Sequence, residues 1–345
     1  MWMIYGANGY TGKLIAEEAK RRGLSPVLAG RSASVGSLAQ ELGLESRIFD
    51  LAEPSAVAAW LKGIKAVLHC AGPFSATSRP MLDGCLASGA HYLDVTGEIS
   101  VFEAVHARSA EATKAGIVAL PGVGFDVVPS DCLAAMLKAE LPSATHLSLA
   151  FQSSAPPSPG TTKTMVEGLA QGGAIRLDGR IISVPAGARS REVDFGRGPR
   201  RVSQIPWGDV STAFYSTGIP NIDVYTVLPR SQAQAARVLG PLARIAVVQR
   251  LLKGVIGLTV RGPSAEQREK LRCRLWGEVR GPGDDRRELR LEIPEGYQFT
   301  VDAALASMER VLQGGLKPGA LTPSLAFGKD FVLGLKGVRL IEENQ

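Results

Sequence analysis

The glycine-rich segment that starts at Gly6 has the residue types and spacing of a phosphate-binding turn. An apolar run, 1–5, leads into it, and a helical pattern follows it. Glycines let the backbone turn tightly and approach a pyrophosphate, and the start of the next helix offers N–H groups and a favourable dipole to an anion. The expected dinucleotide-binding residues of this turn are Gly6, Asn8, Gly9, Tyr10, Thr11 and Gly12.

The end of the next apolar run, 26–30, indicates which dinucleotide would bind. NAD sites usually carry Asp or Glu there to hold the ribose 2′-hydroxyl. This chain has Arg31 and Ser32 instead. A guanidinium group can hold a 2′-phosphate through a bidentate ion pair. The sequence therefore predicts NADP(H), with a solvated surface arginine as the alternative for Arg31.

Two further strand ends carry candidate cofactor contacts. Asp50 closes the third apolar run and is expected beside the adenine, as an acceptor for its amino group. Ala71, Gly72 and Pro73 follow the fourth run, at the crevice where the strand order should reverse. We expect these three residues near the pyrophosphate and the nicotinamide, with an ordinary strand-end turn as the alternative.

Asp126 and Lys163 are the candidate catalytic residues. Reduction by hydride transfer also needs a proton donor or an oxyanion stabiliser beside the cofactor. Both residues follow glycine-containing turns, so we expect them to face the nicotinamide from opposite domains. The alternative for Asp126 is helix capping, together with Ser130 and Asp131.

The remaining polar candidates are expected to be structural. Asp94 and Glu98 are interpreted as hydrogen-bonding groups, His69 as a core histidine and Cys70 as a packing residue. The four cysteines and four histidines form no CxxC motif and no cluster. We therefore expect no metal site and no disulfide framework, and the thiols fit a reducing compartment.

These residues need a scaffold, and the first 120 residues supply its pattern. Short apolar runs alternate with helical patterns, which predicts right-handed βαβ units. The expected strands are 1–5, 26–30, 46–49, 65–70, 91–95 and 117–120. The expected helices are 10–22, 35–42, 54–61, 79–88 and 100–115. Six such strands predict an α/β fold with a Rossmann doubly wound parallel sheet.

The pattern changes after residue 142 to that of an α+β domain built on a mostly antiparallel sheet. Residues 146–152 alternate as a half-buried strand does, and 174–184 predict a hairpin that turns at Asp178 and Gly179. Further strands are expected at 221–228, 271–279 and 288–295, and helices at 161–170 and 301–312.

Composition restricts the partners. The 345 residues are enough for two domains, and a net charge of +6 without basic–aromatic clusters predicts no nucleic-acid partner. No apolar run is long enough to span a membrane, and the glycine turn begins too early for a targeting segment, so we expect a cytoplasmic protein. Residues 224–264 lack Asp and Glu. Their basic amphipathic pattern leaves open peripheral membrane contact, a cover over a lipid-binding cleft, or an ordinary core-facing helix.

Several segments, taken in order, resemble the saccharopine dehydrogenase-like NADP-binding oxidoreductases, and most closely the trans-acting enoyl reductase branch. They are GANGYTG at 6–12, LAGR at 28–31, HCAGPF at 69–74, GAHYLDVTGE at 89–98 and GVGFDVVPSD at 122–131. The resemblance implies that a second domain is inserted after the sixth strand and that the C-terminal segment returns to the first. The predicted domains are 1–135 with 301–345, and 136–300 for substrate binding or dimerisation.

The resemblance implies an NADPH-dependent oxidoreductase that reduces an enoyl or carbonyl group of a small-molecule or acyl, lipid-like substrate. Two alternatives stay open: a protein that binds NADP(H) without turnover, and a saccharopine-type amino-acid dehydrogenase. A homodimer is also left open. The cationic clamps of true saccharopine dehydrogenases have no counterparts that can be placed in this sequence.

Overall fold

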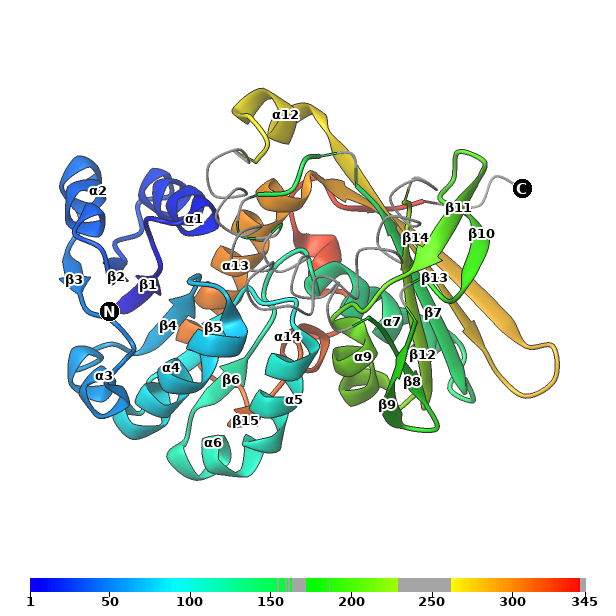
Figure 1. Cartoon of the computed structure of the whole chain (residues 1–345), viewed down its shortest axis with the longest axis horizontal. Helices are drawn as coiled ribbons and strands as arrows, with labels where there is room; N and C mark the ends of the chain where they lie inside the picture. The colour runs from blue at the N-terminus through cyan, green and yellow to red at the C-terminus, as the bar shows by residue number, and fades with distance from the viewer. Residues whose placement is uncertain are drawn as a thin grey trace. The chain divides into compact units, whose positions relative to one another are not determined.

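The computed structural model describes residues 1–153, 155–158, 160, 162, 172–185, 187–228 and 262–341. The chain divides into two compact units (Figure 1). The first unit is Met1–Val128 with Phe299–Gly328, and the second is Pro129–Gln298 with Lys329–Gln345. The chain thus leaves the first unit, builds most of the second and then returns. The sequence predicts that residues 301–345 belong to the first unit. In the structure the returning segment is Phe299–Gly328, and the residues from Lys329 onward belong to the second unit.

The first unit is built on a seven-stranded parallel sheet, sheet A, with strand order β15-β6-β5-β4-β1-β2-β3. Its strands are β1 (Trp2–Tyr5), β2 (Val27–Gly30), β3 (Ser46–Ile48), β4 (Ala66–His69), β5 (His91–Asp94), β6 (Val118–Leu120) and β15 (Gly319–Ala320). The six predicted strands are confirmed. The order reverses at β1, with β2 on one side and β4 on the other, which is the switch point of a doubly wound fold.

Helices cover both faces of sheet A because successive side chains of each buried strand point to opposite faces. Trp2 and Ile4 pack in one core with residues of α1 (Tyr10–Arg21), α2 (Ser34–Leu42) and the returning α13 (Gly296–Gln313). Met3 and Tyr5 pack in the other core. That core also takes residues of α3 (Pro54–Trp60), α4 (Phe74–Ser88), α5 (Ile99–Ala107) and α6 (Ser109–Ala115).

Two predicted helices of this unit have different bounds in the structure. The helix expected at 79–88 begins at Phe74, because the Glu98 carboxylate accepts hydrogen bonds from the backbone N–H groups of Phe74 and Ser75. The helix expected at 100–115 is two helices that meet at Arg108. The Arg108 guanidinium donates to Asp83 and Glu111.

The second unit is built on a mixed sheet, sheet B, with strand order β10-β11-β12-β7-β13-β14-β16 and the β8–β9 hairpin beside β12. Only the pairing of β12 with β7 is parallel in the described part of this sheet. The predicted mostly antiparallel sheet is confirmed. Its strands are β7 (His146–Gln152), β8 (Gly173–Leu177), β9 (Arg180–Val184), β10 (Ser190–Asp194), β11 (Pro199–Gln204), β12 (Asn221–Thr226), β13 (Arg272–Arg280), β14 (Arg286–Pro294) and β16 (Arg339–Leu340).

The sequence predicted one hairpin of sheet B and missed another. The β8–β9 hairpin turns at Asp178 and Gly179, which both have positive φ as a two-residue turn requires. The missed strands β10 and β11 are rich in arginine and have few apolar residues, so no alternation is visible. Their inward-facing Val193 and Val202 pack against Trp276.

Of the described helices of the second unit, the first precedes the strands of sheet B in the sequence and the other two lie between them. They are α7 (Val128–Glu140), α9 (Asp209–Thr217) and α12 (Ala265–Lys270), with α14 (Pro323–Phe327) in the first unit and a 3-10 turn at Phe331–Gly334 in the second. The helix expected at 161–170, Lys163 and most of the basic segment 224–264 lie outside the described residues. Among the residues that are described, no helix has the length and apolarity to cross a membrane.

Candidate cofactor and active site

The glycine turn joins β1 to α1 and packs directly on the loop that follows β4. A Cβ atom on Gly6, where φ is +84°, would lie 2.7 Å from the backbone nitrogen of Ala71. A Cβ atom on Gly12 would lie 2.3 Å from the carbonyl oxygen of Gly6. No side chain fits at either position. The structure therefore brings together the two predicted pyrophosphate segments, the turn from Gly6 to Gly12 and the loop Ala71, Gly72 and Pro73, at the switch point of sheet A.

Helix α1 begins within this segment, at Tyr10, so Gly12 lies in its first turn. Its N-cap is Gly9, whose lack of a side chain leaves room at the helix start, and its first turn contains no acidic residue. Tyr10 and Thr11 occupy the first positions of the helix. The positive end of the α1 dipole thus faces the turn, as an anion-binding site requires.

A polar cluster around Ser34 joins the residues that follow β2 to the glycine turn that precedes α1. The Asn8 side-chain nitrogen donates to the Ser34 hydroxyl at 3.0 Å, and the hydroxyls of Ser32 and Ser34 lie 3.0 Å apart. Arg31 is exposed beside this cluster. The structure thus brings Asn8 and Ser32 together through Ser34, a residue that the sequence argument did not select. Ser34 is the first residue of α2, whose N-cap is Ala33, so it follows no capping pattern that would have identified it.

Asp50 lies at the end of β3, near the same edge. Its carboxylate accepts a hydrogen bond from the backbone nitrogen of Ala52 at 3.0 Å. Burial and, to a smaller extent, the Asp50 charge raise the pKa of Tyr5 to about 12, while Arg31 acts in the opposite direction. The charges of Arg31 and Asp50 thus both act on Tyr5, whose hydroxyl donates to the carbonyl of Phe49 at 3.1 Å.

Asp94 ties together the loops that follow β5 and β6. The buried carboxylate accepts from the Tyr92 hydroxyl at 2.6 Å and from the backbone nitrogens of Thr96 at 3.0 Å and Gly122 at 2.8 Å. Burial raises the pKa of Asp94 to about 6, although these three hydrogen bonds act to lower it. Both carboxylates therefore have structural roles. Glu98 accepts hydrogen bonds at the start of α4, and Asp94 joins the loops that follow β5 and β6.

Asp126 lies on the loop that follows β6, against the loop that follows β5. A Cβ atom on Gly97 would lie 2.6 Å from an Asp126 carboxylate oxygen, so the Asp126 side chain packs closely on the loop that follows β5. Burial raises the pKa of Asp126 to about 7. The returning helix α13 holds this loop as well, because the backbone nitrogen of Phe125 donates to the Thr300 hydroxyl at 3.0 Å. Gly97 and Thr300 are contributors that no local sequence pattern identified.

His69 is a fully buried core residue on the α4 side of sheet A. Its ring lies among Tyr5, Phe74 and Tyr92, and its Nε2 atom is 3.0 Å from the Thr77 hydroxyl. Burial lowers the pKa of His69 to about 3. The ring is therefore neutral at physiological pH, which suits packing and not proton transfer. Among the described residues there is no group of three or more His, Cys, Asp or Glu side chains that could hold a metal ion.

Known proteins share both the sequence of the first unit and the fold of the chain. Residues 2–120 match the family model for the saccharopine dehydrogenase NADP binding domain. The chain is similar to the saccharopine dehydrogenase-like oxidoreductase of Mus musculus (29% identity over 150 residues, 37% of this chain and 35% of that protein). It is also similar to the trans-acting enoyl reductase of Mycobacterium leprae (34% over 142 residues, 37% of this chain and 33% of that protein). The matches thus span about a third of the length of these relatives.

Among solved structures, the apo saccharopine dehydrogenase (L-Glu forming) of Saccharomyces cerevisiae aligns over 99% of each chain with a TM-score of 0.66. At 12% identity this likeness shows the shared fold alone. The predicted resemblance, the Rossmann fold class and the NADP-binding domain are confirmed.

Proposed function

We propose that this chain, with its saccharopine dehydrogenase NADP binding domain in residues 2–120, is an NADPH-dependent oxidoreductase that reduces an enoyl or carbonyl group of an acyl or lipid-like substrate. One observation carries the proposal: Asp126, a carboxyl group with a raised pKa, lies against Gly97 at the same sheet edge as the glycine turn. The named enoyl reductase relative supports the enoyl substrate class.

The described residues fit NADP. The close approach of Gly6 to Ala71 and of Gly12 to Gly6 leaves a turn lined by backbone, as a pyrophosphate requires. Gly9, Tyr10 and Thr11 would lie beside the phosphates at the start of α1, and Pro73 would follow on the neighbouring loop. Arg31, with Ser32 and Asn8, would hold the 2′-phosphate, and Asp50 would lie towards the adenine.

When bound, NADPH supplies the hydride. The task left to the protein is to deliver a proton, or a hydrogen bond, to the atom that becomes negative during reduction. A group whose pKa is about 7 is protonated in roughly half of the molecules at neutral pH, so Asp126 can donate and be reloaded from solvent. Asp94 and Thr300 act as positioning residues, because they hold the two loops between which Asp126 lies.

Lys163 remains our second catalytic candidate, and its position lies outside the described residues. A lysine ammonium could stabilise negative charge on the substrate as reduction proceeds. Replacement by Met keeps the length of the side chain and removes the charge. If Lys163 has this role, Lys163→Met lowers kcat and leaves the affinity for NADPH within about twofold.

The cellular setting is part of the proposal. Cys70, Cys85, Cys132 and Cys273 are free thiols, which supports a reducing, cytoplasmic location. Peripheral membrane contact through the basic segment 224–264 and a homodimer also stay predictions of the sequence.

Binding and turnover can be tested separately. Calorimetric titration of the full chain with NADPH tests the cofactor. The change in nicotinamide absorbance then tests turnover with three probes. Absorbance of NADPH is lost with a 2-enoyl thioester or a 3-ketoacyl thioester, and it is gained with saccharopine and NADP⁺. We expect NADPH binding and oxidation with an acyl thioester. Turnover with saccharopine alone would replace our proposal by the amino-acid dehydrogenase. Tight NADPH binding without turnover of any probe would favour a binding protein.

A further inference from the structure

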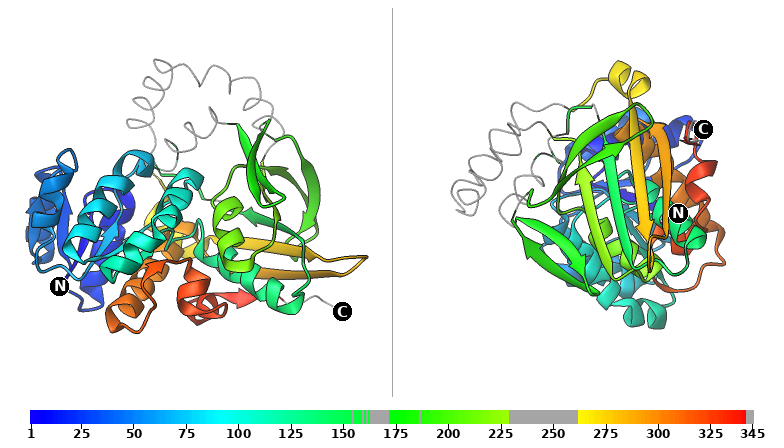
Figure 2. Two further views of the ribbon diagram at one scale, coloured as in Figure 1. Left: turned by 90° about the horizontal axis from the view of Figure 1, so that it is seen from below. Right: turned by 90° about the vertical axis from the view of Figure 1, so that its right-hand side faces the viewer.

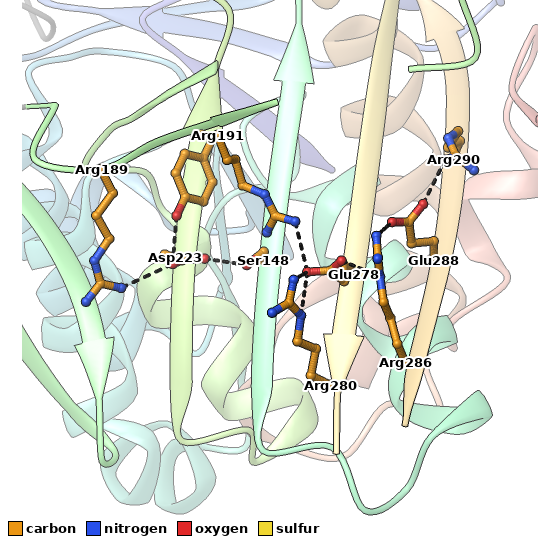
Figure 3. A network of polar contacts seen from close by, with 10 residues as sticks. Ser148, Arg189, Arg191, Asp223, Glu278, Arg280, Arg286, Glu288 and Arg290 are labelled. Atoms are coloured by element: carbon orange, nitrogen blue, oxygen red, sulfur yellow. Dashed lines mark hydrogen bonds and ion pairs between the residues drawn. The ribbon is translucent and has the colours of Figure 1, made fainter. Parts of the chain in front are cut away.

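One face of sheet B carries a network of arginines and carboxylates that the proposed reaction does not use (Figure 3). We call it the arginine face, and its members are Ser148, Arg189, Arg191, Asp223, Glu278, Arg280, Arg286, Glu288 and Arg290. Side chains alternate along strands, so the other face of β13 presents Gly277 to Leu133 and Leu137 of α7. In the right-hand view of Figure 2 the strands of sheet B face the viewer. The arginine face borders a small apolar cluster, because Trp276 on the same side of β13 packs with Val193 and Val202 and lies under the Arg191 guanidinium, 4.7 Å from the ring centre.

The carboxylates of this face, one buried and two half-buried, pair with the guanidinium groups. Glu278, only 1% exposed, accepts hydrogen bonds through Oε1 from Arg191 and Arg280, both at 3.0 Å. Its Oε2 atom forms an ion pair with Arg286 at 2.5 Å. Glu288 accepts Arg286 and, at 2.7 Å, Arg290. Asp223 accepts Arg189 at 3.4 Å and the Ser148 hydroxyl at 2.6 Å.

Three of the five arginines reach the surface, whereas Arg191 and Arg290 are 24% and 11% exposed. Arg189, Arg280 and Arg286 are 56%, 55% and 51% exposed. Their partner carboxylates Asp223 and Glu278 are 17% and 1% exposed. The network holds five guanidinium groups and three carboxylates, and its three most exposed charged groups are arginines, so it favours an anionic partner.

This arrangement is more than a solvated sheet face. Burying the Glu278 carboxylate costs several kcal/mol unless it is paired, and one arginine would complete a pair. Three arginines overcompensate the charge and lose side-chain freedom in doing so. The consequence is a set of planar donor groups fixed before any partner arrives. Preorganised guanidinium forks match carboxylates bidentately and lose less entropy on binding than mobile lysines.

The charge balance also selects the occupant. A second copy would bring its own exposed arginines against these, so like charges would face each other. At an anionic membrane each basic residue contributes about 1 kcal/mol, so an excess of two charges gives only about 2 kcal/mol. A protein surface that carries aspartate and glutamate gains directional contacts with each fixed guanidinium as well as the long-range attraction.

We propose that the arginine face is a docking surface for an acidic protein. Exposed Arg189, Arg280 and Arg286 meet its carboxylates, and Asp223, Glu278 and Glu288 hold these arginines in position from below. The inference does not depend on the reaction that the first unit catalyses.

Fluorescently labelled poly-L-glutamate is the probe, and its binding to the full chain is measured by anisotropy at low ionic strength. Arg189→Gln/Arg280→Gln removes two exposed cations and leaves Arg191 and Arg286 on Glu278, so the sheet keeps its buried pairs. Arg21→Gln/Lys270→Gln removes the same charge from two exposed ion pairs elsewhere. We expect the first variant to weaken binding about tenfold and the second to change it less than about twofold.

Circular dichroism melting and NADPH titration show whether each variant is folded. Equal weakening in the two variants would mean that net charge alone binds the probe, and the proposal would be wrong. The same measurement with phosphatidylglycerol vesicles and with duplex DNA, at equal charge concentration, tests the class of partner. Tighter binding of either one, lost in the arginine-face variant, would replace the acidic protein. If Arg189→Gln/Arg280→Gln fails to fold, Arg189→Gln alone is tested, with Arg21→Gln as its control.

Discussion

At the scale of single residues, Arg31 is the side chain on which the choice of cofactor depends. Its exposed guanidinium follows β2, where an acidic residue would select NAD. Arg31→Asp removes an attraction to the 2′-phosphate and adds a repulsion, so we expect NADPH to bind about a hundredfold more weakly and NADH to change little. Calorimetric titration measures both. Arg310→Asp, an exposed arginine on α13, is the control. A wild-type protein that binds the two cofactors equally well would contradict the assignment.

Asp126 is the residue on which the proposed chemistry depends. Asp126→Asn keeps the shape of the side chain and removes its proton. We expect kcat to fall about a hundredfold or more, with NADPH affinity unchanged, because a proton donor acts in the transition state. In the wild type the donor must be protonated, so the rate falls as the pH rises through about 7. The control is Asp83→Asn, which makes the same substitution at an ion pair with Arg108 and should leave kcat unchanged. A pH profile that stays flat above 7 would remove Asp126 from the mechanism.

At the scale of elements, the β1–α1 turn leaves no room for a side chain. In Gly12→Ala the new methyl group would meet the Gly6 carbonyl oxygen, so the turn must open. We expect loss of NADPH binding and destabilisation by about 1–3 kcal/mol, the usual cost of overpacking. Gly36→Ala in α2 is the control, because its methyl group would meet only the end of the Ile48 side chain at 3.7 Å. Gly36→Ala should leave the affinity for NADPH unchanged. An equal loss of affinity in both variants would mean that close packing of the β1–α1 turn is not required for binding.

The loops after β5 and β6 form a second element-scale unit, joined by Asp94. Asp94→Ala leaves the N–H groups of Thr96 and Gly122 without their carboxylate acceptor, inside the fold. Because each unsatisfied buried group costs about 1–3 kcal/mol, we expect a loss near 3 kcal/mol in urea denaturation. Tyr92→Phe removes only the third hydrogen bond and should cost about 1 kcal/mol. Equal losses from the two variants would show that Asp94 does not join the loops.

At the scale of the whole molecule, two carboxyl groups and two histidines change the free energy of unfolding with pH in opposite directions. Burial raises the pKa of Asp94 to about 6 and of Asp126 to about 7, so the folded state holds protons that the unfolded chain has released. The contribution of these two carboxyl groups to stability falls as the pH rises from about 4 through these pKa values. Burial lowers the pKa of His69 to about 3 and of His106 to about 4, so their contribution falls as the pH drops below 6.5. Between about pH 4 and 6 the two effects oppose each other.

A variant without the two titrating carboxyl groups should therefore show the loss of stability that the two histidines cause on acidification. In Asp94→Asn/Asp126→Asn we expect the free energy of unfolding to fall more steeply on acidification than in the wild type. The difference is up to about 1.4 kcal/mol per pH unit for each carboxyl removed. Urea denaturation at a series of pH values from 4 to 7 gives both slopes. Parallel curves for variant and wild type would mean that these carboxyls titrate normally.

Local pattern alone was sufficient for the parts of this protein whose structure is dictated by near neighbours in the chain. Strands β1, β2 and β4 of the Rossmann sheet are short runs buried on both faces, so their apolar character is continuous and easily seen. The hairpin at Asp178 and Gly179 is encoded by its turn residues. The NADP binding domain follows from the spacing of glycines and from Arg31, because backbone approach and charge are local properties.

Tertiary structure decided whatever depends on residues far apart in the sequence. The α4 start at Phe74 depends on the Glu98 carboxylate, and the Asp126 loop depends on Gly97 and on Thr300 from the returning helix. The β10 and β11 strands carry mostly polar side chains, and their place in sheet B comes from pairing and from two valines that reach the core around Trp276. Burial that raises the pKa of Asp126 is likewise a property of the assembled fold, since desolvation is set by neighbours that no local spacing specifies.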